Sequence, residues 1–454
     1  SGTPNGNVYF AGHSYENGFE LWKTNGTPET TQIFDDIRDG IHGSFPSNFE
    51  NINNKLFFTA NNGTSGFELF ATNTNIDGTV LLKDIEPNDF SSNPVPLATL
   101  GQQLFYSTQD YNYDFTSIET ILKRVDNSNI FNTFSQYRNP SNFLEFNNKM
   151  YFQAEKSDVG SELMVSEGTN ATTSNVVDIN AGATNHSNPA ELTAVGSNFY
   201  FAATNGTDRE LWKSDGTAVG TLRVKNINIF GSSNPNHLIE FGNDLYFFAN
   251  DGLRGATDLY KSDGTSAGTS NLSAPDIDAN TDEISEINRF LVFSATSSAN
   301  GNELFVTTGT TINLLKDINV GTGSSNPNKL TPVGSTIYFK ADDGINGAEL
   351  WKTSGTTLNT VLVKDIRAGV SNSNPTNLFN HNGVLYFAAN DGINGSELWK
   401  TDGTAAGTIM VKDIYEGSLS SSPNGFCTIG NTLYFEANHP QHGKELWKTD
   451  GTAE

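Results

Sequence analysis

The apolar positions of this chain fall into short runs that alternate with polar residues or are apolar throughout, and turn-forming residues separate the runs. The clearest stretch covers residues 374–414, where strands are expected over residues 375–379, 384–389, 396–401 and 408–414. Asn-Gly at Asn382 and Asp-Gly at Asp402 mark hairpin turns between them. No part of the stretch has the 3.6-residue period of a helix. The pattern predicts four short antiparallel strands and an all-β fold.

The third strand of this stretch has a large apolar side chain on each face. Glu397 and Trp399 share one face, whereas Leu398 and Lys400 share the other, because side chains alternate along a strand. Both faces should therefore be covered by other parts of the protein. The glutamate and the lysine are expected to be partly buried and to form ion pairs between blades or across strands.

The same four-strand unit is repeated along the whole chain. The Glu-Leu-Trp strand recurs ten times, and successive copies at Glu349, Glu397 and Glu445 are 48 residues apart. The remaining copies begin at Glu20, Glu68, Thr120, Glu162, Glu210, Asp258 and Glu303. Four short strands at this period are typical of a β-propeller blade.

The predicted fold is one large β-propeller of four-stranded antiparallel blades, with nine or ten repeats of about 48 residues. Residues 1–454 would form a single repeat domain that starts and ends inside a repeat. An open, curved array of the same blades is the alternative.

Composition narrows the class of partner. The formal net charge is −25, which disfavours nucleic acid and anionic lipid and favours divalent cations or basic partners. No stretch of about 18 apolar residues is present, so membrane insertion is not expected. The single cysteine, Cys427, excludes an internal disulfide.

The repeated strand and turn resemble the bacterial ELWxxDGT repeat family. Residues 210–227 and 397–414 carry the pattern most clearly, and the resemblance extends over essentially the whole chain. It implies a large secreted or cell-surface protein, often with several domains, and implies no reaction or ligand. The chain departs from the pattern at residues 120–134 and 270–282.

Function is expected where the repeat is interrupted. The loop that contains Asp110, Tyr111, Tyr113, Asp114 and Phe115 replaces the usual Asp-Gly loop and is longer. Aromatic and acidic side chains together favour contact with a glycan or a protein. The alternative is a decayed hairpin whose rings pack locally.

Three short segments offer metal ligands. Asp276, Asp278 and Asp282 could bind Ca²⁺ through carboxylate oxygens, although the segment lacks the spacing of an EF-hand, and a solvated loop is the alternative. His439 and His442 could share a metal ion, or form an exposed loop. The repeated Asp-Gly loops could also hold calcium, although Asp-Gly is first a turn former.

No catalytic signature occurs in the sequence: GxSxG, HExxH and phosphate-loop patterns are absent. The sequence therefore favours a non-enzymatic extracellular or cell-surface propeller that binds a glycan or protein in adhesion. One alternative is a carbohydrate-active enzyme with acidic residues at the central channel. A structural repeat element of a larger secreted protein or surface assembly is another.

Overall fold

The computed structural model describes residues 6–73, 79–87, 89–111, 118–274, 276–279 and 283–452, with the backbone alone for Asn73, Asp110, Tyr111 and Ile118. The described residues form β-strands and three short 3-10 helices, η2 (Pro28–Thr30), η3 (Asn170–Thr172) and η4 (Thr357–Asn359). Most sheets are four-stranded and antiparallel, which confirms the all-β class. The chain divides into two compact units, Ser1–Arg223 and Val224–Glu454.

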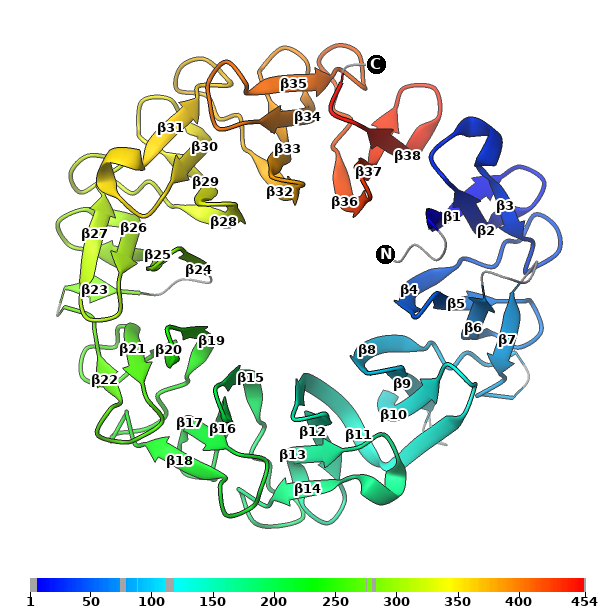
Figure 1. Cartoon of the computed structure of the whole chain (residues 1–454), viewed down its shortest axis with the longest axis horizontal. Helices are drawn as coiled ribbons and strands as arrows, with labels where there is room; N and C mark the ends of the chain where they lie inside the picture. The colour runs from blue at the N-terminus through cyan, green and yellow to red at the C-terminus, as the bar shows by residue number, and fades with distance from the viewer. Residues whose placement is uncertain are drawn as a thin grey trace. The chain divides into compact units, whose positions relative to one another are not determined.

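The first unit contains the blue to green sheets of Figure 1. In chain order they are β1 (Val8–Ser14), β2 (Gly18–Thr24) and β3 (Gln32–Asp35); β4 (Ser47–Ile52), β5 (Lys55–Asn61), β6 (Phe67–Asn73) and β7 (Val80–Lys83); β8 (Val95–Leu100), β9 (Gln103–Tyr111), β10 (Ile118–Asp126), β11 (Phe131–Phe146), β12 (Lys149–Lys156), β13 (Gly160–Ser166) and β14 (Ser174–Val177); and β15 (Ala190–Val195), β16 (Asn198–Thr204), β17 (Arg209–Ser214) and β18 (Leu222–Lys225), within which the chain passes into the second unit.

The second unit contains the green to red sheets of Figure 1. They are β19 (Asn236–Phe241), β20 (Asp244–Ala249), β21 (Asp258–Ser262) and β22 (Ser270–Asn271); β23 (Ile277–Asp278), β24 (Ile284–Ile287), β25 (Phe290–Ser297), β26 (Gly301–Thr307) and β27 (Ile312–Lys316); β28 (Asn328–Val333), β29 (Thr336–Asp342), β30 (Ala348–Thr353) and β31 (Val361–Lys364); β32 (Thr376–His381), β33 (Val384–Asn390), β34 (Ser396–Thr401) and β35 (Ile409–Lys412); and β36 (Asn424–Ile429), β37 (Thr432–His439) and β38 (Gly443–Thr449).

The repeat β32–β35 follows the strands predicted from its pattern. His381 pairs with Val384, so Asn382 and Gly383 form a two-residue hairpin turn, and both have positive φ, 50° and 87°. Asn-Gly is the sequence that tolerates this mirror-image turn, whose twist suits the flanking strands. The strands run in the order β32-β33-β34-β35, each paired with its chain neighbour.

Both faces of this sheet are covered, as the alternation predicted. Leu398 packs with Leu433 and Phe435 of the following repeat. Trp399 packs on the other side with Leu350 and Val363 of the preceding repeat. The core of the second unit therefore lies between successive sheets at this repeat. Each buried side chain of this size contributes roughly 1.5–3 kcal/mol to stability.

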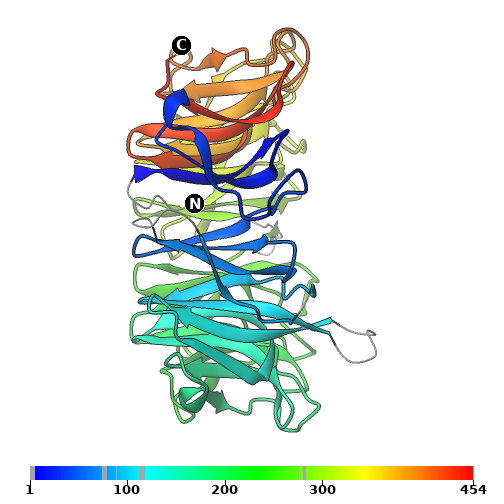
Figure 2. The same cartoon turned by 90° about the vertical axis from the view of Figure 1, so that its right-hand side faces the viewer.

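The first departure from the repeat joins two repeats into one seven-stranded sheet. The first part of β11 pairs with β10, and its second part pairs with β12. Figure 2 shows the pair β9–β10 extending beyond the neighbouring strands of the first unit. Here the fourth strand of one repeat runs directly into the first strand of the next, without the usual Gly/Ser-rich connection.

The second departure adds a strand instead of removing a connection. β22 has two residues, and the chain that follows it forms β23, which pairs with β25 of the next sheet. β24 pairs with the same strand β25 further along, so this sheet has five strands. The interrupted segment thus serves as part of the sheet framework.

Candidate functional site

A buried glutamate is the recurrent polar centre of the repeat. Glu397, the second residue of β34, lies inside the protein with 0% of its surface exposed. Its carboxylate accepts hydrogen bonds from the Ile414 amide (2.9 Å), the Ser421 amide (2.8 Å) and the Ser421 hydroxyl (2.5 Å). The glutamate therefore fixes the connection that leads from the fourth strand to the next repeat. We call this arrangement the glutamate lock.

The lock occurs in both units with the same partners. An isoleucine amide 15 or 17 residues after the glutamate and a serine 22 to 25 residues after it are shared features. The pairs of glutamate and serine are Glu20 with Ser44, Glu68 with Ser92, Glu162 with Ser187, Glu303 with Ser325, Glu349 with Ser373, and Glu397 with Ser421.

Burial dominates the electrostatics of the lock. Removal from water raises the pKa of Glu397, although the hydrogen bonds from Ser421 and the Ile414 amide act in the opposite direction. The pKa values of Glu68, Glu162 and Glu349 are raised for the same reason. A group repeated in this way and enclosed by its own backbone is suited to architecture, because a catalytic acid must reach a substrate.

The predicted ion pairs between blades or across strands are not formed by Glu397 and Lys400. Lys352 and Lys400 donate to the carbonyl oxygens of Gly403 and Gly451, at 2.8 Å and 2.7 Å, in the turn of the following repeat. The glutamate and lysine are three residues apart on a strand, so they point to opposite faces and cannot meet. The lysine links successive repeats, whereas the glutamate acts within one repeat.

A sequence signal for the lock was present. The serine stands two residues before the proline that opens the next repeat, as in Ser373-Asn374-Pro375. The sequence aligned Thr120 with the glutamate of this eroded copy, but Ile121 pairs with Thr108 as Glu68 pairs with Ala60, so Ile121 takes the place of the glutamate. Arg138 replaces the serine before Asn139-Pro140. The two positions change together, and Arg138 forms an ion pair with Glu119 at 2.6 Å.

The predicted aromatic binding loop lies largely outside the described residues. Asp110 and Tyr111 belong to β9, where they pair with Glu119 and Ile118 of β10 through the backbone. Tyr113, Asp114 and Phe115 are not among the described residues. A glycan or protein contact at this loop stays a prediction.

The acidic segment predicted to bind calcium is partly engaged by the backbone. Asp278 accepts a hydrogen bond from the Thr257 amide at 3.0 Å, and Asp276 accepts one from the Ser298 amide at 3.4 Å. Asp282 is not among the described residues, so the three carboxylates together are untested. Within the described ranges, no group of three or more His, Cys, Asp or Glu side chains is arranged to hold a metal ion.

The repeated Asp-Gly loops are closed by their own backbone. Oδ1 of Asp343 accepts hydrogen bonds from the amides of Ile345 (2.9 Å) and Asn346 (2.7 Å), and Asp391 binds its loop in the same way. Burial would raise the pKa of Asp343, but these hydrogen bonds outweigh it and lower that pKa. The aspartates therefore act as turn-forming anions.

The two histidines of the last described hairpin stack on each other. The rings of His439 and His442 are 4.8 Å apart, and His439 also lies 5.9 Å from the ring of Trp447. Nδ1 of His439 accepts a hydrogen bond from the Gln441 amide at 3.3 Å. The predicted sharing of a metal ion has no third described His, Cys, Asp or Glu to complete it.

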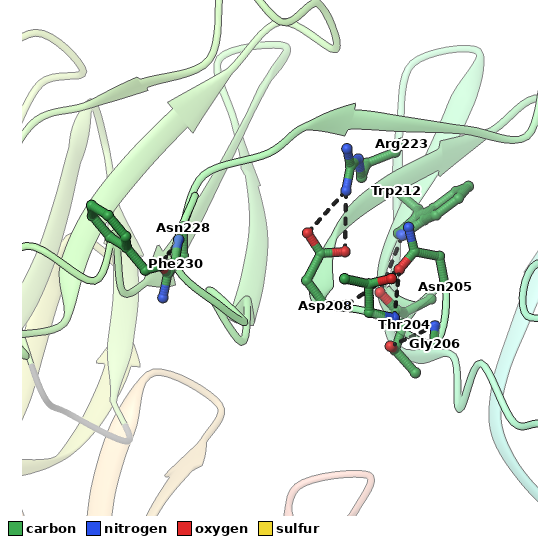
Figure 3. Close-up of polar contacts among 10 residues, drawn as sticks. Thr204, Asn205, Gly206, Asp208, Trp212, Arg223, Asn228 and Phe230 are labelled. Carbon is green, nitrogen blue, oxygen red and sulfur yellow. Dashed lines mark hydrogen bonds and ion pairs between the residues drawn. The ribbon is translucent and has the colours of Figure 1, made fainter.

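In the repeat β15–β18, Asn205 takes the place of the loop aspartate, and Asp208 of the same loop forms an ion pair with β18. Asp208 is buried and accepts two hydrogen bonds from Nη1 of Arg223, at 3.1 Å and 3.0 Å, as Figure 3 shows. The Asn205 side chain caps the loop, and the Trp212 indole donates to the Ala203 carbonyl oxygen at 3.1 Å. These contacts join strands and a loop of one sheet, and they therefore stabilise that sheet.

Solved structures that are similar to this chain include those of enzymes. A puromycin hydrolase is 10% identical, with 76% of this chain and 58% of that chain covered and a TM-score of 0.35. A puromycin-hydrolysing peptidase of Mycobacterium tuberculosis is 11% identical, with the same coverage and a TM-score of 0.34. A prolyl endopeptidase is 11% identical, with 78% and 54% covered and a TM-score of 0.39. No family model and no curated protein matches the chain.

These comparisons correct the leading functional prediction. The sequence favoured a non-enzymatic adhesion propeller, but the solved structures similar to the chain are those of a hydrolase and peptidases, and that prediction is wrong. The chain spans little more than half the length of these enzymes. With TM-scores below 0.5, the likeness does not assign their activity to this chain.

Proposed function

We propose that the chain is the architectural β-propeller-type domain of an enzyme assembly, and that a catalytic domain on the same chain or on a partner performs the chemistry. The observation that carries the proposal is the glutamate lock. The recurrent carboxylates that could have formed an acidic catalytic centre are enclosed by backbone amides and serine hydroxyls. Each lock fixes the path from one sheet to the next, which is a structural task.

The proposal also covers the arrangement of the blades, the family of the chain and its location. Nine or ten repeats would form the blades of one ring, and the open, curved array remains the alternative arrangement. Membership of the ELWxxDGT repeat family and a secreted or cell-surface location belong to the same proposal. Projection images from electron microscopy would separate the two arrangements, since a ring has a central hole and an open array does not.

An activity screen of the purified chain tests the functional part. Substrates would include prolyl peptides, puromycin, simple esters and a panel of polysaccharides. We expect no turnover above that of a heat-denatured sample, because the recurrent carboxylates are held by the fold. Turnover that disappears on substitution of one exposed carboxylate would overturn the proposal and favour a catalytic centre within the repeats.

The screen needs a control for folding. If turnover is found, a Glu397→Ala variant should lose hydrogen-exchange protection in its own repeat without changing the rate per folded molecule, because the lock is structural. A rate that falls in step with that variant's unfolding would show only that the fold is needed. A rate that falls while the fold is intact would place Glu397 in the chemistry and contradict the architectural role.

A further inference from the structure

The second unit carries a row of exposed branched aliphatic side chains at one end of its strands. They alternate between the loops that join the second and third strands and the connections that lead to the next repeat. In order along the unit they are Val320 (84% exposed), Ile345 (69%), Val370 (81%), Ile393 (72%) and Leu419 (60%). We call these five residues the aliphatic row.

Close backbone contacts place these loops and connections side by side. A Cβ on Gly344 would lie 2.9 Å from the side chain of Asn319, next to Val320, and one on Gly347 would lie 2.8 Å from the backbone of Ser371, next to Val370. A Cβ on Gly395 would meet the Leu419 carbonyl oxygen. The loops of Ile345 and Ile393 are therefore each flanked by a connection that bears another member of the row.

The antiparallel order puts the whole row at the same end of the sheets. In the repeats β28–β31 and β32–β35, drawn from yellow to orange in Figure 1, the second-to-third loop and the outgoing connection lie at one end of the strands. The first hairpin and the Asp-Gly-Thr turn lie at the other. Single exposed apolar residues are common on protein surfaces, but a series at equivalent positions of successive, adjoining loops favours a contact surface.

The charges around the aliphatic row are mainly negative. The same loops and connections carry the carboxylates of Asp343, Asp365, Asp391, Asp413 and Glu416, and one guanidinium, that of Arg367. One carboxylate oxygen of Asp365 and one of Asp413 are buried and have no hydrogen-bond partner among the described residues. A surface of this kind repels anionic lipid and a second acidic copy of the chain, and it attracts cationic groups.

From these observations we infer that the aliphatic row is a docking surface for a basic, amphipathic segment of a partner protein. Its apolar side chains would cover the row, and its lysine or arginine side chains would face the surrounding carboxylates. Burial of apolar surface would supply most of the binding free energy. Charge complementarity would raise the association rate and select the partner. The inference rests on the proposed function, because it identifies where an architectural domain would hold the protein that it serves.

A synthetic amphipathic peptide tests the surface directly. The probe is a fluorescein-labelled helix of leucine and lysine, with a leucine–glutamate peptide of the same pattern as its counterpart. Fluorescence anisotropy would measure the affinity of each peptide for the whole chain in low and high salt. We expect the lysine peptide to bind and to weaken with salt, and the glutamate peptide not to bind.

Matched variants distinguish the aliphatic row from general attraction to an acidic protein. The variant I345S/V370S/I393S removes apolar surface and leaves every charge, whereas L358S removes an equally exposed leucine at the opposite end of the strands. We expect the triple variant to lose about tenfold or more in affinity, equivalent to about 1.4 kcal/mol, and L358S to bind like the parent. All of these side chains are exposed, so an unchanged melting temperature should confirm that each variant folds.

Several results would overturn the inference. They are absence of binding by the lysine peptide, equal binding by the parent and the triple variant, binding of zwitterionic lipid vesicles that the triple variant loses, or self-association that the triple variant abolishes. The last two would assign the row to a lipid surface or to a second copy. A failed peptide experiment together with no enzymatic turnover would reject the docking surface and leave the proposed function standing. Turnover with normal peptide binding would do the reverse.

Discussion

The repeats built around Glu68 and around Thr120 lie in the same unit and solve the same problem in two ways. In the first, Glu68 is buried and binds the amides of Ile85 and Ser92 and the hydroxyl of Ser92, which holds the connection after β7. In the second, the apolar Ile121 stands at the position of the glutamate, and β11 continues through 16 residues into the next repeat. The comparison teaches that the glutamate and the connection are one device, because they are lost together.

The apolar core survives this loss. Leu122, Val125 and Phe134 of the Thr120 repeat are buried. Thr120 itself makes a 3.2 Å hydrogen bond from its amide to the Asn139 side chain. Apolar packing between sheets is thus maintained without the glutamate lock. The lock instead determines the path of the connection between one sheet and the next.

Removal of the carboxylate should have the largest effect. Glu68→Ala leaves several buried donors without an acceptor, so we expect a loss of about 3–5 kcal/mol in the stability of that repeat. Thr120→Ala should cost less than about 1 kcal/mol, because it removes a partly exposed hydroxyl. Hydrogen exchange at the amides of Ile85 and Ser92 would report the local change. Equal effects of the two substitutions would mean that the lock adds nothing to the core.

The turn of the motif gives a second test, in the other unit. Gly403 and Gly417 have nearly the same φ, 90° and 95°, but a Cβ on Gly403 would lie 2.6 Å from the Tyr338 hydroxyl, whereas one on Gly417 would meet nothing within 4 Å. We expect Gly403→Ala to cost about 2–4 kcal/mol and Gly417→Ala about 1–2 kcal/mol. The difference in melting temperature between the two variants measures the contact between repeats. Equal melting temperatures of the two variants would show that the Tyr338 hydroxyl moves away from the added methyl group without loss of stability.

The serine of the lock should contribute less than its glutamate. Ser92→Ala removes the 2.7 Å hydrogen bond from the hydroxyl to Glu68 but keeps the amide hydrogen bond, and we expect a loss of about 1–2 kcal/mol. Ser128→Ala, in the exposed turn of the Thr120 repeat, should change stability by less than about 0.5 kcal/mol. Hydrogen exchange at the amides of each repeat would measure the local loss of stability in the two variants. A Ser92 variant as harmless as the Ser128 variant would assign the lock to backbone amides alone.

The strands and their covered faces could be predicted from the sequence because they depend on local periodicity. Leu398 and Trp399 are neighbours on one strand, and alternation alone places them on opposite faces. The turn at Asn382 follows equally from two adjacent residues. Each of these features needs information from only a few consecutive positions.

The role of the glutamate could not be reached in that way. Its partner Ser421 lies 24 residues further on, beyond the fourth strand, where strand periodicity carries no information about side-chain contacts. The charge of Glu397 suggested an ion pair, whereas the fold surrounds it with neutral donors and sends Lys400 to a neighbouring turn. The joint loss of glutamate and serine in the Thr120 repeat was the available signal, and it becomes interpretable once the contact is seen.

Titration of Glu68 should give the smallest effect and the finest distinction between the two repeats. Burial raises the pKa of Glu68 above its ordinary value, so the folded protein binds this proton more readily than the unfolded chain does. The contribution of Glu68 to stability is therefore fully present below its unfolded pKa, about 4.3, and is lost as the pH rises through the raised value. Because glutamine resembles the protonated acid and does not titrate, the melting temperature of the parent should fall relative to that of Glu68→Gln from pH 4 to pH 7.

The matched variant Thr120→Val should show a gap that does not change with pH, since it removes no titrating group. The comparison must be made as a difference, because Asp343 and Asp391 have lowered pKa values and push the stability of the whole chain in the opposite direction. A parent whose melting temperature rises with pH relative to that of Glu68→Gln would mean that the hydrogen bonds from Ser92 and Ile85 favour the anion more than burial opposes it. The lock would then be a site built for a charged carboxylate, and its loss at Thr120 would have removed an anion-binding pocket as well as a connection.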